Sequence, residues 1–118
     1  MTTRETLDRY FDNLARKHGW EASFADDMCF TSYVSPVKQL QGKPAYLQAT
    51  TRFYSMIRRV EVREVITDGD RACARTHYTL QPPNGGPEFA SDVAEWFTVR
   101  DGTITSLDIY FDSAPFPK

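Results

Sequence analysis

Two antiparallel strands joined by a tight turn are predicted by residues 88–112, which have the sequence EFASDVAEWFTVRDGTITSLDIYFD. Apolar and polar side chains alternate along both halves, as they do in strands with one buried face, and an Asp-Gly pair suits the turn between them. The alternation places Glu95 on the same face as Val93 and Phe97, because side chains two positions apart in a strand share a face. Since an unpaired charge is costly to bury, Glu95 is the most informative residue of this segment.

The opposite faces of these two strands are more polar. On the first strand, Trp96 lies among Asp, Ala and Thr residues, a mixture that suits contact with another protein. On the second strand, Ser106, Asp108 and Tyr110 form the more polar face, and Leu107, Ile109 and Phe111 form the apolar face. The hairpin therefore predicts a sheet whose inner face meets a core or pocket and whose outer face carries a tryptophan.

Three further strands are predicted upstream of this hairpin. Residues 60–68 and 71–80 flank an Asp-Gly-Asp turn, and a change of parity between two valines predicts a β-bulge near Glu64. Residues 28–34 alternate in the same way and predict the first strand, which ends at a Ser-Pro pair. Most of the chain after residue 60 is thus expected to be antiparallel sheet.

Two helices are predicted before this run of strands. Thr2 and Glu5 form a capping-box pattern at the start of the first helix, whose apolar residues recur every three or four positions. The second helix begins at Gly42, has a proline in its first turn, and presents a broad apolar face as far as Ile57. A short helix is expected at residues 20–24. Helices followed by antiparallel strands indicate an α+β fold with the helices packed on one face of a curved sheet.

Composition restricts the class of protein. The 118 residues suit one domain at 1–118, with a core at 5–112 and a proline-containing tail at 113–118. A formal net charge of −2 does not provide the basic stripe of a nucleic-acid-binding protein. No apolar run approaches the ~18–20 residues that a membrane span requires. We therefore expect binding to neither nucleic acid nor membrane.

Cysteine and histidine are sparse. Cys29 and Cys73 lie far apart without metal-binding spacing, which predicts reduced thiols in a cytoplasmic protein. His18 and His77 have no second imidazole or paired carboxylate at ligand spacing, so no metal is expected. Phosphate-binding, nucleophile-elbow and zinc-protease motifs do not occur in the sequence. The unusual feature is instead the aromatic content of 14%, enough to fill a core or to line a pocket.

Four short segments resemble those of a known family. They are Phe24-Ala25-Asp26-Asp27 before the first strand, Gly42-Lys43 at the start of the long helix, Asp68-Gly69-Asp70 in a turn, and Ile104 with Asp108-Ile109-Tyr110-Phe111-Asp112 in the last strand. In this order they resemble the nuclear transport factor two-like superfamily, and within it the SnoaL-like and ketosteroid-isomerase-like branch. The resemblance extends over residues 5–112.

The resemblance implies a cone-shaped α+β fold, a cystatin-like roll. In it, a strongly curved, mostly antiparallel sheet wraps around the N-terminal and central helices and leaves a deep, largely apolar pocket. It also implies a homodimer that pairs through the outer face of the sheet, where Trp96 would be central. Members of the family include isomerases, cyclases, epoxide hydrolases, dehydratases and non-catalytic proteins, so the fold by itself names no reaction.

Position by position, the resemblance also assigns candidate site residues. The general base of ketosteroid isomerases falls on Ser32, and the working acid of SnoaL-like cyclases falls on Ile109; neither side chain can act as a base near neutral pH. The oxyanion-binding pair of ketosteroid isomerases falls on Tyr10 and Glu95, which would donate hydrogen bonds to a developing oxyanion. The residues expected to line the ligand pocket are Phe30, Ser32, Tyr54, Thr76, Tyr78, Val93, Phe97, Leu107, Ile109 and Phe111.

These candidates also have structural interpretations. Tyr10 lies on an apolar stripe and could be a core residue, as could the aromatic residues expected in the pocket wall. Glu95 could pair with Arg75 across the hairpin. Asp108 and Tyr110 would form a catalytic pair if the register differed by one residue, although a solvated or interface carboxylate is the simpler interpretation.

Three functional hypotheses follow. The first is an isomerase, cyclase or lyase that transfers a proton on an apolar carbonyl compound, chemistry that needs no cofactor. The second is a non-catalytic protein that binds a small apolar or aromatic molecule in the same pocket, which the side chains at Ser32 and Ile109 favour. The third is a dimeric assembly module whose pocket is filled by its own side chains. A basic group within reach of the ligand would distinguish the first hypothesis from the second.

Overall fold

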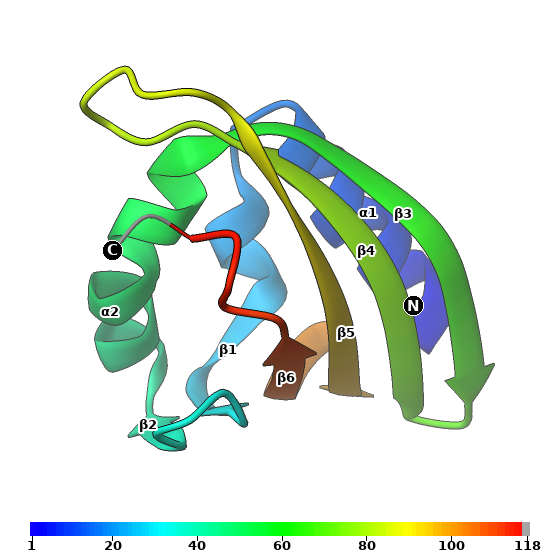
Figure 1. Ribbon diagram of the computed structural model, residues 1–118. Helices are drawn as coiled ribbons and strands as arrows, with labels where there is room; N and C mark the ends of the chain where they lie inside the picture. The colour runs from blue at the N-terminus through cyan, green and yellow to red at the C-terminus, as the bar shows by residue number, and fades with distance from the viewer. Residues whose placement is uncertain (117–118) are drawn as a thin grey trace.

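Two α-helices lie on one side of a six-stranded sheet in the computed structural model of the chain, which describes residues 1–116 (Figure 1). Residues 117–118 of the expected tail lie outside the described residues. The α+β class expected from the order of helices and strands is confirmed. Along the chain the elements are α1 (Thr3–Ala15), the 3-10 helix η1 (Trp20–Ser23), β1 (Phe24–Ser32), β2 (Lys38–Gln41), α2 (Lys43–Met56), β3 (Ile57–Asp68), β4 (Arg71–Leu80), β5 (Phe89–Arg100) and β6 (Thr103–Phe111).

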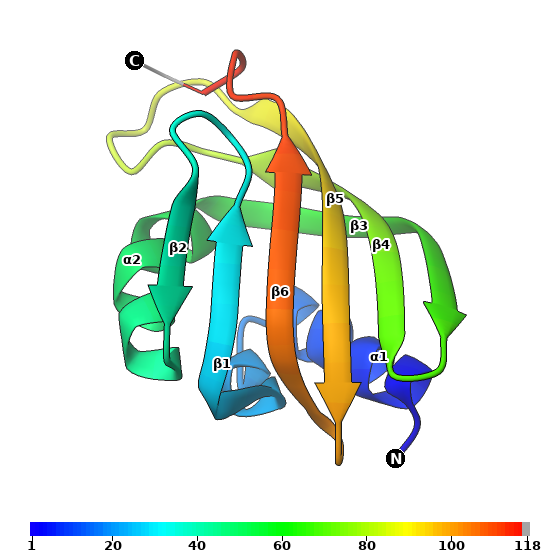
Figure 2. The ribbon, with the colours of Figure 1, turned by 90° about the horizontal axis from the view of Figure 1, so that it is seen from below.

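The strands form one open, mixed sheet in the order β2-β1-β6-β5-β4-β3 (Figure 2). Neighbouring strands are antiparallel except for β1 and β6, which run parallel near the middle of the sheet. Strands β3, β4 and β5 bend strongly around helix α1 (Figure 1). The expected curved, mostly antiparallel sheet is therefore confirmed, with a parallel pair that brings the first strand beside the last.

Helix α1 starts at the predicted capping box. The Thr2 hydroxyl accepts a hydrogen bond from the backbone N–H of Glu5 (3.1 Å), and the Glu5 carboxylate accepts one from the backbone N–H of Thr2 (2.8 Å). The apolar stripe of the helix packs against the inner side of β3, β4 and β5. Its buried residues are Thr6, Leu7, Tyr10, Phe11 and Leu14.

Helix α2 begins after Gly42, whose φ of +93° lies in a region that favours glycine. Pro44 occupies the first turn, where its missing N–H removes no helical hydrogen bond. The helix buries Tyr46 and Met56 and packs mainly on β1 and β2, while its Phe53 ring reaches Tyr78 of β4. The two helices thus divide the concave face of the sheet between them. Within residues 1–116, neither helix is long and apolar enough to cross a membrane.

Several strand boundaries differ from the predictions, including the end of β1 at Ser32 rather than residue 34 and the start of β3 at Ile57 rather than residue 60. Strand β1 begins at Phe24 rather than at residue 28. The short strand β2 pairs with β1, with Lys38 opposite Ser32, and was not predicted because its four residues carry little apolar alternation. The bulge expected near Glu64 is confirmed, since the register between β3 and β4 shifts between Val62 and Glu64.

Candidate functional site

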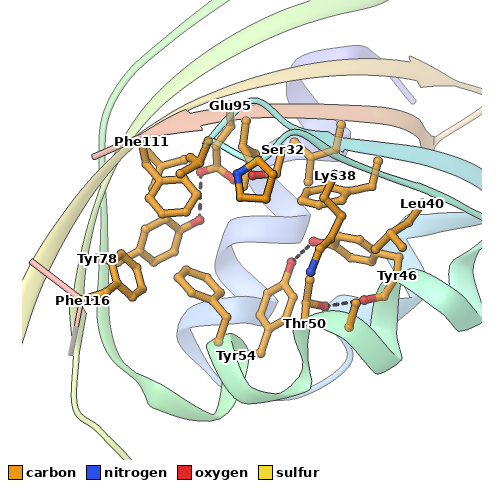
Figure 3. A pocket seen from close by; sticks show the side chains of 18 of the residues that line it. Ser32, Lys38, Leu40, Tyr46, Thr50, Tyr54, Tyr78, Glu95, Phe111 and Phe116 are labelled. Carbon is orange, nitrogen blue, oxygen red and sulfur yellow. Dashed lines mark hydrogen bonds between the residues drawn. The ribbon is translucent and has the colours of Figure 1, made fainter. Parts of the chain in front are cut away.

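A cavity of about 390 Å³ lies between α2 and the inner face of the sheet (Figure 3). This volume is within the range of small-molecule sites, which are about 300–1,000 Å³. Most of the wall is apolar or phenolic, and the residues come from β1, β2, α2, β4, β5, β6 and the segments that follow β1 and β6. They are Phe30, Ser32, Val34, Ser35, Pro36, Lys38, Leu40, Tyr46, Ala49, Thr50, Phe53, Tyr54, Tyr78, Val93, Glu95, Leu107, Ile109, Phe111 and Phe116.

The structure brings most of the predicted site residues together around this cavity. Those in its wall are Phe30, Ser32, Tyr54, Tyr78, Val93, Glu95, Leu107, Ile109 and Phe111. Three predicted residues do not line it, namely Tyr10, Thr76 and Phe97. Phe97 is instead a core residue, 1% exposed, whose ring centroid lies 6.1 Å from those of Tyr10 and Phe11. Thr76 is fully enclosed on the inner face of β4.

Glu95 is the only carboxylic acid among the described residues of the wall. The residue is 3% exposed, and its Oε1 accepts a hydrogen bond of 2.8 Å from the Tyr78 hydroxyl. It does not pair with Arg75, whose side chain instead contacts Glu64 (3.6 Å) on the outer face of the sheet. Glu95 is therefore buried next to the cavity without a cationic partner within residues 1–116.

Burial raises the pKa of Glu95 to about 7, because the charged form loses its hydration. Two neighbouring hydroxyls favour the Glu95 anion and lower its pKa, but by less than burial raises it. The Thr76 hydroxyl lies close by without completing a hydrogen bond, and the Tyr78 hydroxyl donates one. At neutral pH the carboxyl group is therefore divided between its acid and anion forms.

Three tyrosine hydroxyls form a chain beside this carboxyl group. The Tyr10 and Tyr54 hydroxyl oxygens are 2.9 Å apart, and the Tyr54 hydroxyl is also hydrogen-bonded to that of Tyr46. Burial raises the pKa of each phenol well above its ordinary value, and the charge of Glu95 acts in the same direction. All three phenols are consequently neutral hydrogen-bonding groups at physiological pH.

The hydroxyl chain gives Tyr10 a different place from the one expected. Tyr10 is fully buried under the cavity and reaches it only through Tyr54, which lines the wall. The ring of Tyr54 also stacks on Trp20, with centroids 3.9 Å apart. Tyr10 can therefore position Tyr54, but a ligand in the cavity would meet Tyr54 and Tyr46.

Asp108 and Tyr110 of β6, the alternative catalytic pair, do not face the cavity in the observed strand register. Asp108 lies opposite Trp96 on the outer face of the sheet, while Leu107 and Ile109 face the cavity. Of the two carboxylic acids Glu95 and Asp108, Glu95 lines the cavity and Asp108 does not.

Within residues 1–116, the structure gathers no group of three or more His, Cys, Asp or Glu side chains that could hold a metal ion.

Several wall residues were not predicted. Lys38 and Leu40 belong to β2, and their alternation with two glutamines was a weak signal for a strand that faces the cavity on one side. Tyr46, Thr50 and Phe53 lie on the apolar face of α2, which sequence periodicity identified as buried without indicating a cavity. Phe116 enters the wall from the segment after β6.

Comparisons with known proteins agree with this architecture. The family model of the SnoaL-like domain matches residues 7–107. None of the curated proteins matches the chain in sequence.

Solved structures with the same fold include three from bacteria. A proposed isomerase from Bacillus subtilis superposes with a TM-score of 0.79 at 19% identity, covering 97% of this chain and 91% of that one. A proposed SnoaL-like polyketide cyclase from Jannaschia sp. CCS1 superposes with a TM-score of 0.77 at 18% identity, covering 98% of this chain and 93% of that one. A Catenulispora acidiphila protein with a ketosteroid isomerase-like fold, in complex with trimethylamine, superposes with a TM-score of 0.75 at 18% identity. The superposition covers 94% of this chain and 88% of that one. At such low identity these likenesses establish the fold alone.

Glu95→Gln should stabilise the protein by an amount that depends on pH. The carboxyl group has a pKa near ~4.3 in an unfolded chain, but about 7 in the native protein. Between these values the unfolded chain releases its proton while the native protein keeps it, so the wild type loses stability as the pH rises. At ~1.36 kcal/mol per pKa unit, the variant should gain about 3 kcal/mol over the wild type between pH ~4 and pH ~8.

Urea unfolding of both proteins across this pH interval measures the difference. Glu88→Gln, which removes an exposed carboxylate, is the control. A difference between Glu95→Gln and wild type that stays constant with pH would show that the carboxyl group is not desolvated.

Proposed function

This chain belongs to the SnoaL-like family, and we propose that it binds a small, mostly apolar carbonyl compound in its cavity and transfers a proton on that compound through Glu95. The reaction class is that of isomerases, cyclases and lyases that act without a cofactor. The observation that carries the proposal is a carboxyl group with a pKa of about 7 in a wall that is otherwise largely apolar and phenolic.

A pKa near the working pH suits proton transfer. A general base must be ionised to accept a proton and yet basic enough to hold it, and both conditions are best met when its pKa is near neutrality. Ionised Glu95 would take a proton from the carbon next to the carbonyl group, and the electrons of that C–H bond would move toward the carbonyl oxygen. Protonated Glu95 would then return the proton at another position. This role differs from the hydrogen-bond donor expected from the family resemblance.

The tyrosine chain supports the same chemistry. Three hydroxyls share two hydrogen bonds, so one hydroxyl hydrogen remains for a further partner. Tyr10 is enclosed at one end, and Tyr46 lines the cavity at the other. If Tyr10 donates to Tyr54 and Tyr54 to Tyr46, the remaining hydrogen points from Tyr46 toward a ligand. Such a donor would stabilise the negative charge that develops on the carbonyl oxygen.

Non-catalytic binding in the same cavity is the second candidate. It is favoured by Ser32 and Ile109, because both line the cavity at positions where related enzymes carry an acid or base. The assembly-module hypothesis fits less well, since the cavity of about 390 Å³ is not filled by the described side chains.

We also propose that two copies associate through the outer face of the sheet. Trp96 and Tyr110 are 43% and 47% exposed there, and Tyr110 stacks on Tyr33 with ring centroids 4.7 Å apart. Large aromatic side chains are typical of protein interfaces. Sedimentation at micromolar concentration should give twice the chain mass of 13.5 kDa, and Trp96→Asp should shift the equilibrium toward monomer. A wild type that sediments only as a 13.5 kDa species would remove this proposal.

Hydrogen–deuterium exchange of an apolar ketone tests the proton transfer directly. The wild-type protein in D₂O should accelerate exchange at the carbon next to the carbonyl group of β-tetralone, as followed by proton NMR. Glu95→Gln should slow this exchange by ~10²-fold or more, because it removes the base, whereas Glu88→Gln should have no effect. The wild-type rate should rise with pH and level off above about 7, where Glu95 is ionised.

Equal exchange rates for wild type and Glu95→Gln would contradict catalysis by Glu95. If β-tetralone still binds to both proteins in that case, non-catalytic binding becomes the supported function.

A further inference from the structure

Four wall residues form a row across neighbouring strands. Lys38 of β2 is paired with Ser32 of β1, Ser32 with Ile109 of β6, and Ile109 with Glu95 of β5. All four side chains line the cavity. Neighbouring strands are about 4.8 Å apart, so the backbones of Lys38 and Glu95 are separated by about 14 Å along the sheet. The cavity thus has a cation at one end of this row and an acid at the other.

The charge at the β2 end has no ion-pair partner within residues 1–116. Lys38 and Glu95 are the only ionic side chains among the described residues of the wall. Lys38 forms none of the ion pairs found within residues 1–116. Its side chain extends from β2 over the cavity toward α2 (Figure 3). A lysine in this position can meet a negative charge on a molecule that occupies the cavity.

The surroundings of Lys38 suit one particular anion. The hydroxyl-bearing residues Ser32 and Ser35 also belong to the wall, while the middle of the row is the apolar side chain of Ile109. One ammonium group matches the single charge of a carboxylate, whose two oxygens accept hydrogen bonds from ammonium and hydroxyl donors alike. A phosphate dianion would leave much of its charge unpaired here.

Resting on the function proposed above, we infer that the compound bound in the cavity is a keto acid. Its carboxylate lies at Lys38, its carbonyl group lies near Glu95, and an apolar body lies between them against Ile109. The two polar ends would fix the direction in which the compound enters, because reversing it would place a carboxylate beside Glu95 and repel the ionised form of that group.

Calorimetric titration with two matched probes tests this inference. The probes are γ-benzoylbutyrate and its amide, γ-benzoylbutyramide, which share the aryl ketone and end in a charged carboxylate or an uncharged amide of similar size. At neutral pH the wild type should bind the carboxylate about fivefold more tightly than the amide, the size expected for a partly exposed ion pair. Added salt should reduce this preference.

Two lysine variants separate the ion pair from general charge effects. Lys38→Met keeps the apolar stem of the side chain, so it should bind the amide as the wild type does and lose the preference for the carboxylate. Lys43→Met removes a lysine of α2 that does not line the cavity, and it should keep the preference. Lys38 is exposed on the edge strand β2, and circular dichroism should show that both variants fold.

The outcomes distinguish the two proposals. Equal affinity of the wild type for both probes, or a preference that survives in Lys38→Met, would overturn the role of Lys38 while leaving the proposed carbonyl-binding cavity intact. If the wild type binds neither probe, the proposed function fails, and the keto-acid inference fails with it.

Discussion

Strand β5 can bury Val93, Phe97 and Val99 only by burying Glu95 with them, because all four side chains share one face of the strand. The carboxyl group is consequently held among apolar neighbours with one hydrogen bond, from Tyr78. Its desolvation raises its proton affinity, and its position at the cavity makes that affinity available to a bound molecule. The buried acid in the cavity wall thus follows from the alternation of one strand.

The division of the concave face between the two helices makes room for this site. Helix α1 closes over β3, β4 and β5, where Tyr10, Phe11 and Phe97 pack edge to face. Helix α2 lies toward β1 and β2 and leaves a cavity against the middle of the sheet. The hydrogen bond between the Tyr10 and Tyr54 hydroxyls joins the two regions, so the buried core under α1 supports a polar group in the cavity wall.

Alternation in the sequence was sufficient to place Glu95 on the inner face, because the period of a strand does not depend on what covers it. Alternation could not show that Phe97 and Thr76 lie in the core rather than in the cavity wall, because this depends on where α1 packs along the strands. The position of Tyr10 behind Tyr54 has the same origin. Lys38 was missed because β2 is defined by its pairing with β1 rather than by apolar residues of its own.

Carbon-detected NMR titration of the Glu95 side-chain carboxyl, assigned by its loss in Glu95→Gln, tests the central claim most directly. Burial next to the cavity without a cationic partner raises the pKa of this group, so the expected midpoint lies near pH 7. A midpoint at or below the ~4.3 of an exposed glutamate would show that the carboxyl group is solvated or paired, and it would contradict both the buried site and its role in proton transfer.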